Sequence, residues 1–350
     1  MSENKKRNFG KTLFTIITLA LSAGILLYFL FSTNGISELG SIISTLKLSW
    51  LFLAIFCAII GWFIEGFVLH LFCRHFDHKW TYHRSFTVGM VGVLYNAITP
   101  FATGGQPMQI ITLRGMDMDT GMASSIIAVK SLSYQIVMVL YALIMVVMKL
   151  HYFQTSVSNF SFLTVIGLFT NCIFIASIIL FMISEKLTDK ILRTSLHVLS
   201  KYKICKHPDE RYEKIHAHLQ VFHDASKIMG NTWRLYLTAC VLTTLQITLG
   251  SLIPYFIYRS FNLRGAQIST MIAAQVFVSM VSAFVPLPGS SGGAELSFSA
   301  FFGPYFTQNK MIPAIILWRI ITYYLNIAFG SAYIYIINRK SEPNSDTEDH

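Results

Sequence analysis

Four ionisable residues lie within apolar segments of the sequence: Glu65, Lys130, Glu295 and Arg319. Charges inside a membrane are costly, and they mark sites that bind or move a substrate or a proton. Arginine offers a planar fork of donors that suits a phosphate, and a Glu295–Arg319 pair would lower the desolvation cost of both charges. These residues therefore indicate a polar centre that meets a lipid headgroup or couples to a proton. The alternatives are a structural ion pair and, for Glu65, a side chain that reaches the membrane interface.

A repeated interruption accompanies these charges. The runs 100–105 and 288–293 both read Pro, three residues, Gly-Gly, and each follows a short apolar segment. Hydrocarbon offers no partner to backbone groups that Pro and Gly free, so such interruptions persist only beside protein or a water-filled cavity. A matched pair of interrupted segments indicates the central site of a transporter. The predicted hinge residues are Pro100, Pro107, Pro286 and Pro288.

Polar residues gather around both interruptions. A half-helix that starts after Gly105 or Gly293 would direct free N–H groups and a partial positive charge at the break, which favours an anion. The polar side chains either line a wet cavity or only satisfy the freed backbone groups, and a tight turn is the alternative for each Gly-Gly. The predicted substrate-binding and translocation residues are Glu295, Arg319, Lys130, Gln106, Asn96, Thr103, Gly104, Gly105, Ser290, Gly292 and Gly293.

The composition is that of a membrane protein. The 350 residues are 53% hydrophobic and 13% charged, whereas soluble domains carry about 25% charged residues. The net charge of +10 is better explained by loops beside anionic lipid than by nucleic acid. We predict an all-α polytopic membrane protein. Its long apolar segments are 12–31, 50–72, 123–148, 162–183, 234–258 and 311–337.

The distribution of Lys and Arg predicts the orientation. The N-terminus and the loop 184–233 are rich in both, so we expect both chain termini on the cytoplasmic side of a bacterial plasma membrane. Residues 85–113 would then re-enter from the inside and 267–303 from the outside. This arrangement gives six full spans and two re-entrant hairpins, or eight spans if the hairpins are counted, in an inverted repeat over about 50–148 and 234–337. Only Arg259 and Arg264, on the outer side, depart from the rule.

The remaining organisation is simple. We predict one transmembrane domain over 1–340, followed by a disordered acidic tail, 341–350. Residues 187–201 suit a basic amphipathic helix on the inner leaflet or a solvated connector. The sequence has no phosphate-binding Gly-x-x-x-x-Gly-Lys-Ser/Thr loop, no Gly-x-Ser-x-Gly elbow, and no His or Cys spacing of a metal site. We therefore expect no enzymatic activity, no cofactor and no metal.

Three stretches carry a resemblance to a known family. They are Asn96 to Pro107, Pro288 to Glu295, and Leu317-Trp318-Arg319 with Tyr323-Tyr324. Over about 10–338 the chain resembles the membrane domain of lysylphosphatidylglycerol synthase/flippase proteins, including stand-alone members without a synthase domain. Here Ser290 stands where the family motif often has Gly.

The resemblance implies translocation of a lipid between leaflets, such as an aminoacylated or other phospholipid. Its headgroup would pass a polar centre where the two hairpins meet near the midplane, with cavities that open toward opposite leaflets. A glycolipid or a polyprenyl-linked sugar is another cargo. The alternative function is an intramembrane lipid- or glycolipid-modifying transferase, or its accessory subunit. Membrane phospholipids are the expected partners, and a homodimer and a separate lipid-modifying synthase stay open.

Overall fold

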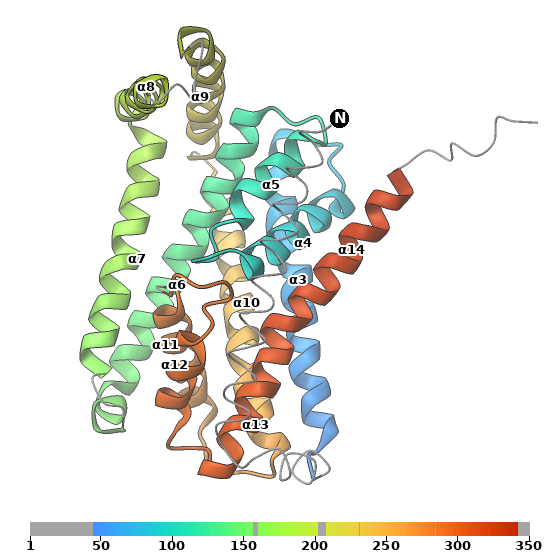
Figure 1. The fold of residues 1–350 in the computed structure, drawn as a ribbon, viewed down its shortest axis with the longest axis vertical. Helices are drawn as coiled ribbons and strands as arrows, with labels where there is room; N and C mark the ends of the chain where they lie inside the picture. The colour runs from blue at the N-terminus through green and yellow to red at the C-terminus, as the bar shows by residue number, and fades with distance from the viewer. Residues whose placement is uncertain (1–44, 157–159, 202–207, 231, 284, 342–350) are drawn as a thin grey trace, which may run out of the picture.

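The computed structural model describes residues 45–156, 160–201, 208–230, 232–283 and 285–341, and the regular structure in these ranges is helical (Figure 1). The predicted segment 12–31 and the tail from 342 onward lie outside the described residues. The helices are α3 Leu48–Phe76, α4 Tyr82–Ile98, α5 Gly105–Arg114, α6 Thr120–Ser156, α7 Phe160–Ile183, α8 Glu185–Lys201, α9 Pro208–Gly230, α10 Trp233–Ser260, α11 Ile268–Ser282, α12 Gly293–Phe302, α13 Gln308–Arg319, the π-helix η1 Ile320–Tyr324 and α14 Leu325–Ser341.

The predicted membrane class is confirmed. Among the described residues, 4 helical stretches are long and apolar enough to cross a membrane: Leu48–Phe76, Thr120–Thr155, Trp233–Ser260 and Gln308–Ile337. They contain the predicted segments 50–72, 123–148, 234–258 and 311–337. The segment 162–183 falls in α7, whose C-terminal part joins α8 at a bend of 96°, and this pair brings the candidates to 5. The protein is thus an all-α polytopic membrane protein.

Two short-helix pairs lie between the long helices. The first hairpin consists of α4 and α5, and the second of α11 and α12. They extend from opposite ends of the bundle toward its middle (Figure 1). There the two breaks meet, because Pro100 and Pro288 form an isolated antiparallel β-bridge. This contact agrees with the prediction that the two hairpins meet. The inverted repeat and the re-entry of the hairpins into a membrane stay predictions.

Each hairpin is anchored in its own apolar cluster. Phe72, Leu113 and Ile126 are buried where the first hairpin meets α3 and α6. Phe277 and Phe298 are buried where the second hairpin meets α10 and α13. Away from these clusters the helices present large apolar side chains outward, as lipid-facing helices do.

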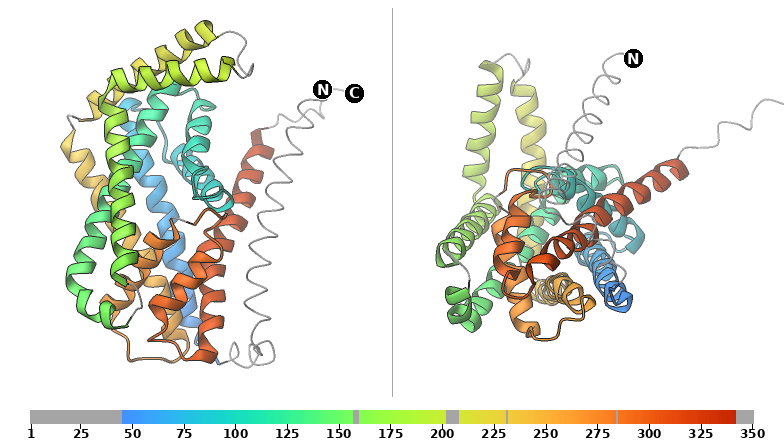
Figure 2. Two further views of the ribbon diagram at one scale, coloured as in Figure 1. Left: turned by 60° about the vertical axis from the view of Figure 1, so that its left-hand side comes forward. Right: turned by 60° about the horizontal axis from the view of Figure 1, so that its bottom comes forward.

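Two helices lie outside the long bundle. The basic α8 and its neighbour α9 lie across one end (Figure 2), the end where α4 begins and α5 terminates. The amphipathic helix predicted over 187–201 is therefore present as α8. At the other end, the Arg259 guanidinium lies 4.6 Å from the ring centre of Trp50 and donates to the Tyr255 hydroxyl at 2.9 Å. Arg259 is the basic residue in the last turn of α10, and the predicted topology places it on the outer side as an exception to the charge rule.

Candidate functional site

The first break is closed by side chains of α4. The Asn96 Oδ1 accepts the Gly105 N–H at 3.0 Å, and the Thr99 Oγ1 accepts the Gly104 N–H at 2.9 Å. These two acceptors satisfy donors that the start of α5 would otherwise leave unpaired. The expectation of free N–H groups here is therefore wrong for both glycines. Pro107 is accommodated because it lies in the first turn of α5, where its missing N–H has no intrahelical role.

The backbone at this tip is strained. Phe101 and Ala102 have φ of 53° and 52°, in the left-handed region of backbone conformation that residues other than glycine rarely adopt. Such conformations cost about 1–3 kcal/mol each and persist where the surroundings enforce them, often at ligand sites. The Phe101 ring is 50% exposed despite its apolar character. The tip thus presents an aromatic ring outward from a strained turn.

The second break is closed by its own helix. Gly292, at φ 85°, precedes α12, and its N–H donates to Glu295 Oε2 at 2.6 Å. A carboxylate in the first turn of a helix also interacts favourably with the helix dipole. This contact occupies the N–H of Gly292, the residue just before the helix start. Ser290 lies at φ 54°, while Pro286 is exposed and Pro288 is buried.

The predicted Glu295–Arg319 pair is present and buried. Arg319 Nε donates to Glu295 Oε1 at 2.6 Å, and Nη1 donates to the Gly289 carbonyl at 2.9 Å. The side chains are 2% and 5% exposed for Glu295 and Arg319. Arg319 lies directly before η1, and its guanidinium lies 5.0 Å from the Tyr323 ring centre. The arginine therefore holds the second tip and the start of α12 against the last long helix.

A second ion pair joins α3 and α6. Lys130 donates to Glu65 Oε1, and each side chain is 14% exposed. The same Glu65 oxygen lies 3.4 Å from Gln109 Nε2, and its other oxygen accepts from Gln246 Nε2 at 3.3 Å. Four helices, α3, α5, α6 and α10, thus meet at one carboxylate. The sequence left Glu65 between a functional role and an interfacial one, and the structure places it at the centre of this network.

The Glu65–Lys130 network opens into a cavity of about 710 Å³. Residues of both tips line it, together with side chains from α3, α4, α5, α6, α7, α10 and α11. We call this the central cavity. Its polar lining residues are Glu65, Asn96, Thr103, Gln106, Gln109, Lys130, Ser131, Tyr134, Gln135, Asn171, Gln246, Ser279, Ser282 and Ser290.

The structure divides the predicted site in two. Lys130, Gln106, Asn96, Thr103 and Ser290 line the central cavity. Glu295 and Arg319 are not among its lining residues but bind the second tip, whose Ser290 lines it, so their share in one polar centre stays a prediction. Gly104, Gly105, Gly292 and Gly293 form the helix starts at the two breaks. Asn96 both caps α5 and lines the cavity, which unites the two roles left open for it.

Several cavity residues escaped prediction. Gln135 and Tyr134 lie on α6 beside Lys130, and Gln246 lies on α10. A glutamine within an apolar segment carries no charge, so it gives a weaker sequence signal than Lys130 does. The positions of these residues in the sequence also do not form a polar helix face that would distinguish them from other polar residues of the same helices.

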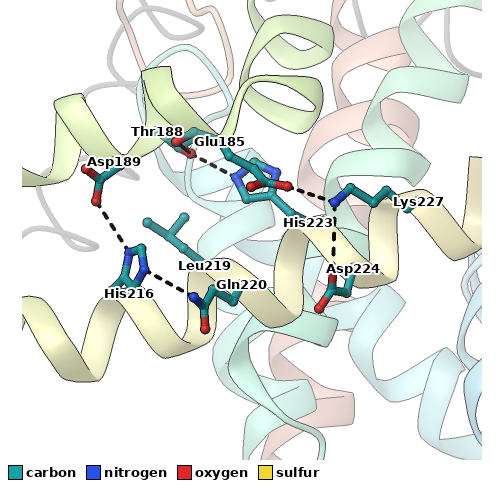
Figure 3. Close-up of a pocket in the computed structure, with 9 residues that line it drawn as sticks. All are labelled: Glu185, Thr188, Asp189, His216, Leu219, Gln220, His223, Asp224 and Lys227. Atoms are coloured by element: carbon teal, nitrogen blue, oxygen red, sulfur yellow. Dashed lines mark hydrogen bonds and ion pairs between the residues drawn. The ribbon is translucent and has the colours of Figure 1, made fainter.

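A smaller pocket of about 360 Å³ lies between α8 and α9 (Figure 3). His216 points toward Asp189, and Lys227 reaches Glu185 at 2.8 Å. The Tyr212 hydroxyl and the Arg193 guanidinium donate to Asp189 and hold the pKa of that carboxyl below its usual range. Lys227 lowers the pKa of Glu185 in the same way. These exposed contacts join the two helices outside the long bundle.

Comparison with known proteins gives the family. Residues 15–330 match the family described as "Lysylphosphatidylglycerol synthase TM region". The chain belongs to this family. It is also 24% identical over 312 residues to a "UPF0104 membrane protein" of Archaeoglobus fulgidus, which covers 81% of this chain and 86% of the relative. The family is membrane-associated and lipid-related, as the resemblance of the three motif stretches implied.

Proposed function

We propose that this protein translocates lipids between the leaflets of the plasma membrane, with both termini in the cytoplasm. The observation that carries the proposal is the central cavity, which lies where the two tips meet inside an apolar bundle. The lipid-related family supports it. The proposal assigns no catalytic residue, and transport runs downhill or uses an existing gradient.

The cavity addresses the main barrier to lipid exchange. A polar headgroup crosses hydrocarbon slowly because its hydrogen bonds to water have no replacement there. The amides and hydroxyls of the central cavity supply replacements at the depth where the tips meet. Exposed apolar side chains outside the cavity, such as Leu140 and Leu143, leave the acyl chains in contact with lipid-like surface. The headgroup thus passes through protein while the chains stay outside.

The Glu65–Lys130 pair keeps this passage neutral. Each charge compensates the other, and Glu65 also orients the amides of Gln109 and Gln246. An unpaired Lys130 would retain lipid phosphates and raise the barrier to release. Removal of Glu65 alone should therefore slow translocation more than removal of both charges.

Proteoliposomes with acyl-labelled fluorescent lipids and an external quencher measure the rate. We expect Glu65→Gln to lower it by about tenfold, which corresponds to about 1.4 kcal/mol in barrier height. The double variant Glu65→Gln/Lys130→Met should recover part of that loss. Arg193→Gln, which removes an exposed charge on α8, is the matched control and should keep the wild-type rate. Wild-type rates in both cavity variants, with folded protein confirmed by gel filtration, would contradict the proposal.

A further inference from the structure

The lining of the central cavity indicates which type of headgroup it accepts, and this inference rests on the proposed lipid translocation. We propose that it accepts an uncharged, hydroxyl-rich headgroup, such as the sugar of a glycosylated lipid. Three features support this: the charges are internally satisfied, the remaining polar groups are amides and hydroxyls, and aromatic rings lie among them.

The charged groups near the cavity are already engaged. Glu65 and Lys130 are the only charged residues that line it within the described chain, and they bind each other. The N–H groups of Gly104 and Gly105, which would favour a phosphate, are bound to Thr99 and Asn96. Arg319 binds Glu295 and the Gly289 carbonyl. Its Nη2 has no partner within the described residues, but it is buried and Arg319 does not line the cavity. A charged headgroup in the cavity would have to break the contacts of Glu65, Lys130 or the two glycines, whereas a neutral one leaves them intact.

The uncharged polar side chains that line the cavity suit hydroxyls. Six amide side chains line the cavity: Asn96, Gln106, Gln109, Gln135, Asn171 and Gln246. An amide presents both a donor and an acceptor, as does each sugar hydroxyl, so the two groups pair in either direction. Within the described residues, the amides of Gln106 and Gln135 bind no other side chain or backbone group. The Ser282 hydroxyl oxygen is buried without a hydrogen-bond partner there, although it lines the same cavity.

Aromatic rings complete the lining. Phe101, Tyr134 and Phe174 all line the cavity and are 50%, 40% and 42% exposed. The C–H face of a sugar ring is apolar and is buried favourably against such rings. Amides for the ring edge and aromatics for its face together match a sugar better than a phosphate or an amine.

The test compares headgroups in one preparation. Proteoliposomes with the full chain receive acyl-labelled glucosyl-diacylglycerol, phosphatidylglycerol, phosphatidylethanolamine or lysylphosphatidylglycerol. We expect the glucosyl lipid to cross about tenfold faster than the lysyl lipid, because one or two more hydrogen bonds are made in the passage. Faster crossing of the lysyl lipid, or equal rates for all four, overturns the sugar assignment and leaves translocation standing. If no lipid crosses above protein-free vesicles, the proposed function itself fails.

Variants connect the preference to the amides. Gln135→Leu keeps the side-chain size and removes the amide, and we expect it to slow the glucosyl lipid about fivefold while phosphatidylglycerol keeps its rate. Gln106→Leu, from the other side of the cavity, tests the same point if the first variant folds poorly. Gln220→Leu on α9 is the control. An equal effect on both lipids contradicts the inference, as does inhibition by free glucose at millimolar concentration, which would indicate a soluble sugar site.

Discussion

Two acid–base pairs lie near the middle of this bundle, and they differ in what surrounds them. Glu295 and Arg319 are 2% and 5% exposed, and their other hydrogen bonds go to the backbone of the second tip. Glu65 and Lys130 are each 14% exposed and face the central cavity, where their neighbours are amide side chains. The Glu295–Arg319 pair thus holds parts of the fold together, whereas the Glu65–Lys130 pair lines the proposed passage.

The difference separates stability from transport. A buried pair whose partner atoms are all protein groups contributes by preventing an unpaired charge. A pair beside a water-accessible cavity has solvent to compensate a lost partner, so its loss changes the passage more than the fold. We therefore expect loss of Glu295–Arg319 mainly to lower stability, and loss of Glu65–Lys130 mainly to change the translocation rate.

Breaking the buried pair should give the largest effect. Arg319→Met leaves the Glu295 carboxylate without its cation and frees the Gly289 carbonyl. Loss of one partner of a buried pair destabilises by about 3–5 kcal/mol. Intrinsic fluorescence during thermal unfolding in detergent would show a much lower midpoint than in wild type.

The cavity pair provides the contrast in the same assay. Lys130→Met should shift the midpoint far less than Arg319→Met. If the two variants lower the midpoint equally, the comparison between the pairs fails. Glu295→Gln/Arg319→Met should be more stable than the arginine variant alone, because no unpaired charge stays buried.

The sequence predicted the larger features of this arrangement well. Long apolar runs predicted the four long apolar helices of the described residues, and the Pro and Gly-Gly spacing predicted two breaks, which meet at Pro100 and Pro288. The Glu295–Arg319 contact followed from the cost of two charges in one apolar region. Each of these signals is either local in the sequence or depends on a charged residue, which is easily recognised within an apolar segment because it is rare there.

The composition of the cavity was harder to foresee. It is assembled from seven helices, and its uncharged amides resemble ordinary polar residues until the fold brings them together. At the first helix start, Asn96 and Thr99 turn back to bind the N–H groups of Gly104 and Gly105, which depends on the turn conformation and was not foreseen. Assignment of Glu65 required knowing that α6 places Lys130 beside it.

Substitution at Gly289 tests how firmly the second tip is held. Its φ is 59°, and a Cβ there would overlap the Tyr323 ring. Gly289→Ala should destabilise the protein by about 1–3 kcal/mol, through backbone strain and displacement of the ring. Gly250→Ala is the control, because no atom lies within 4 Å of a Cβ at that helical position. Equal midpoints for the two variants would show that the tip is free to adjust.

A third acid–base pair extends the comparison to the exposed end. Asp189 and Arg193 on α8 are 29% and 64% exposed. Burial decreases from Glu295–Arg319 through Glu65–Lys130 to this pair, so its loss should have the smallest effect. Asp189→Asn should leave the thermal midpoint and the translocation rate close to wild type, and loosen only the contact of α8 with α9.

The pH dependence of that contact has a definite sign. Donation from Tyr212 and Arg193 lowers the pKa of Asp189 in the folded protein. A lowered pKa gives stability that is present above the ordinary carboxyl pKa and is lost as pH falls through the folded value. Hydrogen exchange, expressed as protection factors for α8 and α9, should therefore show wild-type protection at neutral pH that declines below about pH 4. Asp189→Asn should begin with lower protection and change less over the same range. A decline of equal size in the variant would assign the acid sensitivity to Glu185, whose pKa Lys227 lowers in the same pocket.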